Sequence, residues 1–402
     1  MSETCVPIYL DNNSTTRADP SVVQAMLPFF AERFGNASSS HDLGSEAASA
    51  VNQARRSLQQ LLGNAHEHEI AFTSGGTEAN NTAILSALAT QDGRDEIVTT
   101  SVEHSAILAL VEQLATRGVK THVIPVDSCG RIDIEAFRRA VGPRTAIASV
   151  MWANNETGTI FPVEFLAGLA REAGALFHCD AVQAVGKVRI DLKDSAIDML
   201  SLSAHKLHGP KGIGALYLRK GTKFKPLIWG GSQERRRRGG TENVPGIVGL
   251  GKAAELAAER LEPERVRIGA LRDRLEQAIL HGGDCTVLGD VGNRLSNTAD
   301  IAFEHLDGEA IVHHLNRAGI AASLGAACNS GSMEPSHVLR AMRVPATSLR
   351  GAVRFSLSRE TTVEDVDQVV SVLSDIVAQL RAMPRACANP ASDTASFRRL
   401  TS

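Results

Sequence analysis

Several groups of polar residues stand directly after short apolar runs, where a sheet would bring their side chains together. In an open α/β sheet, ligands bind at the carboxyl ends of the strands, so residues at these points are the first candidates for chemistry. Five such groups occur, at residues 74–77, at His104, and at residues 154–156, 180–183 and 203–206. Together they offer backbone amides, imidazoles, a carboxylate and an amine, which can bind a phosphate and form an imine.

The first group, Ser74-Gly75-Gly76-Thr77, precedes an expected helix and has the composition of a phosphate-binding loop. Glycines let the backbone approach a ligand, and the first N–H groups of a helix are unpaired and lie at the positive end of its dipole. The loop lacks the lysine of a Walker motif and the full glycine pattern of a dinucleotide-binding turn. Alone, it is explained equally well as an ordinary tight turn.

Lys206 follows a predicted buried strand within Ser203-Ala204-His205-Lys206. A lysine in dry surroundings can stay neutral and form an imine with a carbonyl compound, although an isolated lysine is more often a surface residue. Asp180 follows another strand and could be a helix N-cap, but a buried carboxylate is also what keeps a pyridinium nitrogen protonated. The phosphate loop, the carboxylate and the lysine together indicate pyridoxal 5'-phosphate (PLP).

Cys328 differs from the other cysteines because small and polar residues surround it over residues 323–332. Such a run favours a loop that presents the thiol, and nearby positive charge or a base would be needed to form the nucleophilic thiolate. Cys179 suits an inert place inside a strand. The remaining cysteines lie near the chain ends or in turn-like contexts, at Cys5, Cys387, Cys129 and Cys285.

The elements that must position these residues alternate between helical patterns and short apolar runs from about residue 44 to residue 262. This alternation predicts an α/β fold with a parallel sheet covered by helices. Helices are expected over residues 51–62 and 78–88, and strands over residues 70–72, 145–152, 175–179 and 198–202. Beyond residue 263 the sequence predicts a charged helix over 266–280, a strand over 298–303 and a final helix from about Val363.

This pattern predicts a division of the chain into two domains. We expect an N-terminal segment, residues 1–15, that joins the small domain, and a large PLP-binding domain over residues 16–262. A small C-terminal domain over residues 263–382 carries the cysteine loop, and residues 383–402 are expected to form a flexible tail because they lack any periodicity.

Composition excludes several classes of function. A chain of 402 residues with 43% hydrophobic residues can bury a large core, and a net charge of −3 gives no general attraction to nucleic acid or an anionic membrane. The arginines at 235–238 are more typical of a solvated or interfacial segment. No apolar run approaches the roughly 20 residues of a membrane span. The N-terminus has no basic leader, so we expect a cytoplasmic protein. Six scattered cysteines without a CxxC pair argue against disulfides and structural zinc.

Five motifs in a fixed order resemble those of the class V aminotransferase superfamily, and within it the cysteine desulfurases of the NifS/IscS type, most of all the NifS branch. They are Tyr9-Leu10-Asp11-Asn12-Asn13-Ser14-Thr15-Thr16, Ser74-Gly75-Gly76-Thr77-Glu78, Ala153-Asn154-Asn155-Glu156-Thr157-Gly158, Asp180-Ala181-Val182-Gln183 and Ala204-His205-Lys206. The resemblance spans about residues 8–380. It implies the type I PLP fold, with a mainly parallel seven-stranded sheet and a smaller α+β domain, and an obligate homodimer with two sites at the subunit interface.

The resemblance also implies a role for each site residue. Lys206 would form the imine with PLP, and His104 would lie over the face of the ring. Further PLP contacts would come from Gly76, Thr77, Asn155, Asp180, Gln183, Ser203 and His205, with Thr241 reaching the phosphate of the neighbouring subunit. Asn155 and Arg354 would hold the substrate carboxylate.

The implied reaction converts L-cysteine to L-alanine and leaves the sulfur as a persulfide on Cys328. An iron-sulfur scaffold protein would then accept the sulfur, in cluster assembly related to nitrogenase. No resident metal is expected, although Cys328 could transiently share an Fe–S cluster with the acceptor. Leu324 and Asn329 depart from the small or hydroxyl residues usual in this loop, which bears on its mobility and on turnover. The alternatives are an aminotransferase, a selenocysteine lyase, or a sulfur-scaffold or regulatory protein that keeps PLP without turnover.

Overall fold

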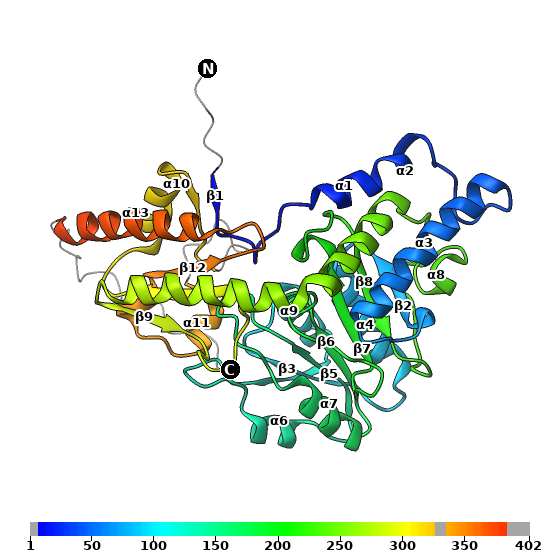
Figure 1. The fold of residues 1–402 in the computed structure, drawn as a ribbon. Helices are drawn as coiled ribbons and strands as arrows, with labels where there is room; N and C mark the ends of the chain where they lie inside the picture. Colours follow the sequence, from blue (N-terminus) through cyan, green and yellow to red (C-terminus); the bar gives the residue numbers. More distant parts are fainter. Residues whose placement is uncertain (1–6, 326–334, 384–402) are drawn as a thin grey trace.

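The computed structural model describes residues 7–325 and 335–383, and its largest feature is a seven-stranded sheet (Figure 1). The strands occur in the order β2-β8-β7-β6-β5-β3-β4, and only β8 runs opposite to the other six strands. Their bounds are β2 Ile70–Thr73, β3 Glu96–Thr100, β4 Lys120–Ile124, β5 Thr145–Met151, β6 Leu176–Asp180, β7 Met199–Ser203 and β8 Gly214–Leu218. The predicted α/β fold with a mainly parallel sheet is confirmed, and each predicted strand of this part occurs within two residues of its expected bounds.

Helices cover both faces of this sheet, because successive strand residues point to opposite sides. On β5, Ile147 packs into a cluster with α4 and α5, whereas Ala148 and Val150 pack into a second cluster with α3, α6, α7 and the first half of α9. The bounds of these helices are α3 Asp42–Leu61, α4 Gly76–Thr90, α5 Ser105–Ala115, α6 Ile134–Ala140, α7 Val163–Glu172 and α9 Val244–Leu280. Except for β4 at the sheet edge, the strands are therefore buried on both faces, as in a parallel sheet covered by helices.

The helix α9 is longer than predicted. The charged helix expected from residue 266 is its C-terminal part, and the helix continues through Pro263 from a start at Val244. Its first half contains glycines where it packs against other helices: a Cβ on Gly251 would lie 2.5 Å from the Cβ of Ala54 on α3, and one on Gly249 would lie 2.6 Å from the Met26 sulfur. These glycines permit close packing although glycine lowers helix propensity.

A second, three-stranded antiparallel sheet has the order β12-β10-β9 and packs with the second half of α9 and with α10 and α13 (Figure 1). The bounds are β9 Cys285–Leu288, β10 Thr298–Phe303, α10 Gly308–Arg317, β12 Ala352–Ser356 and α13 Val363–Ala382. The N-terminal strand β1, Ile8–Tyr9, pairs with β11, Ile320–Ala321. The predicted domain boundary at residue 262 falls inside α9 and stays a prediction.

The remaining elements are short. They are α1 Pro20–Met26, α2 Pro28–Ala31, α8 Gln233–Arg236, α11 His337–Ala341, α12 Ala346–Leu349 and the 3-10 turns at Glu67–Glu69 and Ala204–Lys206. Among the helices of residues 7–325 and 335–383, none has both the length and the apolar composition that a membrane crossing requires.

Candidate active site

A cavity of about 290 Å³ lies at the carboxyl ends of β5, β6 and β7. Its lining includes ten of the predicted site residues, namely Gly76, Thr77, His104, Asn155, Asp180, Gln183, Ser203, His205, Lys206 and Arg354. The structure therefore brings these residues together, as expected for strand-end residues of a parallel sheet. Thr241 is exposed and does not line this cavity, and Cys328 lies outside the described residues.

Lys206 stands in the single 3-10 turn that follows β7. Its Nζ donates hydrogen bonds to the backbone oxygens of Asn13, at 2.5 Å, and Ser14, at 2.7 Å. The segment after β1 therefore crosses the sheet end and forms one wall of the cavity. The two carbonyl oxygens orient the amine at the cavity wall, where it can form an imine with a carbonyl compound.

Asp180 is the last residue of β6 and is buried at the cavity wall. Its Oδ2 accepts a hydrogen bond from Asn80 Nδ2 at 2.7 Å, and its Oδ1 accepts one from the backbone N–H of Val182 at 3.0 Å. Asn80 is on α4, one turn beyond the Gly76 that begins the helix. These two donors fix the carboxylate so that it faces the cavity.

The N-terminus of α4 forms the other end of the site. A Cβ on Gly76 would lie 2.7 Å from a methyl carbon of Val182, so only glycine fits at this point. Gly76 and Thr77 contribute first-turn N–H groups, and the Ser203 hydroxyl and the His205 ring line the same cavity. Burial, and then the positive charges of Lys206, Lys211 and Lys187, lower the pKa of His205 to about 4. His205 is therefore a neutral hydrogen-bonding group near pH 7.

His104 lies between β3 and α5, where its ring is held by a backbone contact. The N–H of Ala106 donates to His104 Nδ1 at 3.1 Å, so the imidazole caps α5. The preceding Glu103 is fully buried; its Oε1 accepts hydrogen bonds from the Met151 N–H at 3.0 Å and from Thr100 Oγ1 at 2.8 Å. Burial raises the pKa of Glu103 to about 8, and the charge of Asp180 adds to this effect. The residue that precedes His104 is therefore an uncharged carboxylic acid near pH 7.

Arg354, on β12, is 1% exposed and reaches the cavity from the second sheet. Its Nη1 donates to the backbone oxygens of Asn155 at 2.9 Å and Gly325 at 3.1 Å. Its Nη2 donates to Asp11 Oδ1 at 2.7 Å and Ser14 Oγ at 2.8 Å. A substrate carboxylate must therefore displace one of these partners to form the bidentate pair that guanidinium groups favour.

The chain on both sides of residues 326–334 borders this arginine end of the cavity. Gly325 lines the cavity, and Ser336 Oγ donates to the buried carboxylate of Glu156 at 2.5 Å. Burial raises the pKa of Glu156, whereas the Ser336 hydroxyl and the charges of His337 and Arg354 lower it. Gly325 has a φ of +79°, and a Cβ at this position would lie 3.3 Å from Glu156 Oε2, so glycine is required here as well.

Some lining residues were not predicted as site residues. They are Asn13, Ser14, Asn80, Met151, Ala153, Val182 and Gly325. Asn80 could have been predicted from the sequence, because a polar residue one turn into a helix lies on the same side as the phosphate-binding first turn. The local sequence pattern gave no reason to place Asn13 and Ser14 in the site, because they lie in an irregular segment.

The donor set matches the parts of PLP. Helix N–H groups, a hydroxyl and a neutral imidazole suit its phosphate, a buried carboxylate suits its ring nitrogen, an amide suits its phenolic oxygen and an amine suits its aldehyde. A cavity of about 290 Å³ is at the lower end of the range for small-molecule sites. Within the two described ranges, no cluster of three or more His, Cys, Asp or Glu side chains could hold a metal ion.

Comparison with known proteins agrees with this interpretation. The family model of class V aminotransferases matches residues 8–369. The chain belongs to the class V aminotransferase family. Enzymes of this family depend on PLP, which confirms the predicted cofactor.

The relatives of this class V chain are cysteine desulfurases. It is 78% identical to a cysteine desulfurase of Bradyrhizobium diazoefficiens over 96% of this chain and 98% of the relative. It is 58% identical to the cysteine desulfurase NifS of Azotobacter vinelandii, over 93% of each chain. A solved NifS-like protein superposes with a TM-score of 0.88 at 37% identity, covering 93% of this chain and all of the other. The resemblance to NifS-like cysteine desulfurases is confirmed.

Proposed function

We propose that this class V enzyme is a cysteine desulfurase that converts L-cysteine to L-alanine and holds the released sulfur as a persulfide on Cys328. The observation that carries the proposal is one cavity in which Lys206, Asp180 and Arg354 meet. These three side chains supply an imine-forming amine, a carboxylate for a ring nitrogen and a fork for an amino-acid carboxylate. The names of the relatives at 78% and 58% identity point to the same activity.

The residues divide the work of the reaction. When bound, PLP supplies a ring that draws negative charge away from the substrate α-carbon. Asp180 holds a proton on the ring nitrogen, and Gly76, Thr77, Ser203 and His205 hold the phosphate. Arg354 orients the substrate carboxylate after exchanging one of its present partners, and Lys206 moves the proton at the α-carbon. His104 covers the face of the bound ring.

Sulfur transfer requires a nucleophile of the protein's own. The Cys328 thiolate attacks the substrate sulfur, a new S–S bond forms, and the C–S bond breaks with its electron pair passing to the substrate carbon. Protonation of that carbon yields alanine. Cys328 follows Gly325 by three residues in sequence, and Gly325 lines the cavity beside Arg354.

We also propose a homodimer in which Thr241 completes the phosphate site of a second copy. Its exposure and its position away from the chain's own cavity support this assignment. Large apolar side chains are exposed on and near α1 and α2 and before α8, including Phe34 at 66% and Trp229 at 75%, as expected of a surface that a partner covers. Sedimentation analysis should give twice the chain mass, and a monomer with full cofactor occupancy would rule this out.

The biological setting follows the same relatives. We propose transfer of the sulfur to an iron-sulfur scaffold protein in the cytoplasm, in cluster assembly that serves nitrogenase. NifS of Azotobacter vinelandii supports this choice among cysteine desulfurases. The domain division at residue 262, with the cysteine loop on the smaller C-terminal part, is part of the same proposal.

The test compares Cys328→Ser with the unmutated enzyme and with Cys129→Ser, which removes a partly exposed thiol elsewhere. Cys328→Ser should bind PLP and cysteine but lose production of alanine and sulfide by at least 100-fold, because a hydroxyl is a weak nucleophile toward sulfur and cannot hold a persulfide. Mass spectrometry after one turnover should find one added sulfur on the peptide that contains Cys328. Sulfur on another cysteine, or alanine formed at the normal rate by Cys328→Ser, would disprove the assignment.

A further inference from the structure

Lys187 lies beside the site, although no motif marked it. It ends the turn formed by residues 182–187 after β6. Gly186 has a φ of +78°, and a Cβ there would lie 3.3 Å from the Cβ of Ala257, so this turn packs closely against α9. Gln183 and Lys187 are four residues apart, which places them on the same side of a helical turn. Lys187 Nζ donates a hydrogen bond to Gln183 Oε1 at 2.9 Å.

Two partners fix which way the Gln183 amide points. Lys187 Nζ donates to the amide oxygen, as an ammonium group must and a neutral amine can. A backbone carbonyl only accepts, so Asn13 must face the amide nitrogen, which donates to it at 2.9 Å. Both contacts fit the same orientation, and the Asn13 carbonyl, which can only accept, requires it.

The same carbonyl connects Gln183 to Lys206. Asn13 O accepts hydrogen bonds from Gln183 Nε2 and from Lys206 Nζ, so the two nitrogens converge on one oxygen. An amide nitrogen carries two hydrogens, and the second is available on the wall of the 290 Å³ cavity that Gln183 lines. In PLP, the phenolic oxygen is on the ring carbon next to the one that bears the aldehyde, so it must lie near the lysine that binds the aldehyde.

We propose that Lys187 is a positioning residue: by holding the side-chain oxygen of Gln183, it keeps the Gln183 N–H directed at the phenolic oxygen of PLP. The inference rests on the proposed function of the cavity. A donor at this position stabilises negative charge on the phenolic oxygen. If the amide turned over, its own oxygen would face that charge and would destabilise it.

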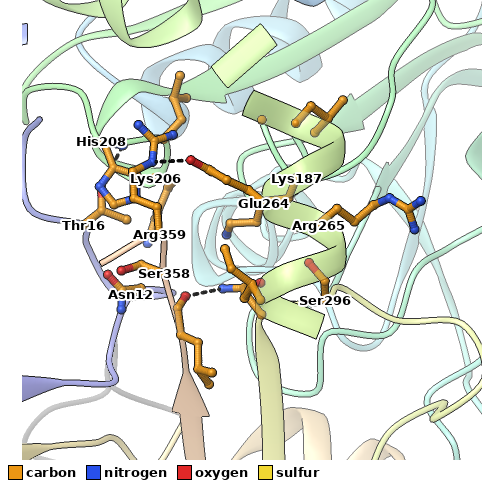
Figure 2. A pocket seen from close by; sticks show the side chains of 16 residues that line it. Asn12, Thr16, Lys187, Lys206, His208, Glu264, Arg265, Ser296, Ser358 and Arg359 are labelled. Atoms are coloured by element: carbon orange, nitrogen blue, oxygen red, sulfur yellow. Dashed lines mark hydrogen bonds and ion pairs between the residues drawn. The ribbon is translucent and has the colours of Figure 1, made fainter. Parts of the chain in front are cut away.

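The surroundings of Lys187 suit a fixed donor. Lys187 and Lys206 line a second cavity of about 40 Å³, toward Glu264 and Arg265 of α9 (Figure 2). A space of this size admits ordered water that can occupy further ammonium hydrogens. The nearby carboxylate of Glu264 is paired with Arg359 at 3.1 Å and so does not take the place of Gln183 as partner. Burial, and then the charges of Lys206 and Arg354, lower the pKa of Lys187 to about 7, yet the neutral amine still donates.

The competing explanation is that Lys187 acts only by its charge on Lys206. Lys211 provides a matched control for charge, because both lysines lower the pKa of His205 through space, whereas Lys211 is exposed. A double-mutant cycle with Gln183 then separates the two explanations, since an effect that passes through Gln183 must vanish when Gln183 is absent.

The experiment uses the PLP-loaded enzyme and two readouts other than turnover: the rate at which PLP is released, and the absorption spectrum of the bound PLP as a function of pH. Lys187→Met should speed release by about 10-fold, the effect of losing one oriented hydrogen bond to a charged oxygen, and should shift the spectrum toward the form with a protonated phenolic oxygen. Lys187→Arg, which keeps a donor, should restore most of the release rate, and Lys211→Met should leave both readouts unchanged. Thermal unfolding checks that each variant folds, and Lys187→Ala takes the place of Lys187→Met if the latter does not.

The cycle decides the outcome. Gln183→Ala should reproduce the effect of Lys187→Met, and adding Lys187→Met to Gln183→Ala should change neither readout further. Equal effects of Lys187→Met with and without Gln183, or an effect of Lys211→Met of the same size, would overturn the proposal. If Gln183→Ala alters neither readout, Gln183 does not contact the phenolic oxygen, and that part of the proposed function fails as well. If Gln183→Ala has an effect and Lys187→Met has none, only the role of Lys187 is refuted.

Discussion

Replacing Glu103 by glutamine should make the protein more stable at high pH than the unmutated chain. Glu103 is fully buried, and its Oε2 has no hydrogen-bond partner among the described residues. Burial raises its pKa to about 8, so the native protein holds this carboxyl in its neutral form near pH 7. Glutamine has nearly the same shape and keeps an oxygen that can accept from the Met151 N–H and the Thr100 hydroxyl.

The size of the effect follows from the two pKa values. The ordinary value is 4.5 and the folded value is about 8, so between them the native state keeps a proton that the unfolded chain releases. The contribution of the neutral acid to stability is complete below pH 4.5 and is lost as the pH rises through 8. Stability should fall by about 1.4 kcal/mol for each pH unit in this window, roughly 4–5 kcal/mol in total.

Urea unfolding of the PLP-saturated enzyme at pH 6, 7 and 8 measures the difference between Glu103→Gln and the unmutated protein. The free energy of unfolding of Glu103→Gln should rise relative to that of the unmutated protein as the pH increases. The slope should be close to the value for release of one proton, about 1.4 kcal/mol per pH unit. Glu112→Gln, on the exposed side of α5, serves as the control and should show no such slope. A constant difference across the three pH values would refute the claim that Glu103 is neutral in the native protein.

Two further substitutions test the roles of cavity residues. Lys206→Ala should abolish both covalent attachment of PLP and turnover, whereas the control variant Lys211→Ala should keep both. Absorption spectra measure the attachment and alanine assays measure the turnover. Normal activity of Lys206→Ala would show that another residue binds the PLP aldehyde. Arg354→Ala should raise the half-saturating cysteine concentration roughly 100-fold, because the substrate carboxylate loses a charge pair worth about 2–3 kcal/mol. It should also lower the free energy of unfolding by about 3 kcal/mol, because Asp11 loses its ion pair with the guanidinium group. Cysteine titration and urea unfolding measure the two effects, and an unchanged half-saturation point would assign the carboxylate to another residue.

Much of the cavity was predictable because its residues follow strands. Asp180, Ser203 and Lys206 each stand at the end of an apolar run, and in a parallel sheet the ends of such runs meet at one edge. The fold class followed from the same alternation. The specific roles came from the family resemblance, since an aspartate after a strand is equally suited to cap a helix.

What could not be predicted depends on contacts between distant parts of the chain. Asn13 faces Lys206 because Asn12 and Asn13 are held by Ser356, 344 and 343 residues away, and no local pattern reports such a pairing. The start of α9 was missed for another reason. Its glycines at 249 and 251 weaken the helical signal, and their value lies in the close approach of other helices, which only the folded structure reveals.

The long-range pairing of the N-terminal segment has a consequence for synthesis of the protein in the cell. Residues 8–13 leave the ribosome more than 300 residues before their partners at Ile320 and Ser356 are translated. The last strand of the seven-stranded sheet ends at Leu218, so at roughly 5–20 residues per second the sheet has at least about 5 seconds to form before Ile320 is translated, while the wall of its cavity is still missing. Lys206 therefore acquires its Asn13 contact only after Ser356 has been translated, so the cofactor site is completed well after the strands that carry most of its residues.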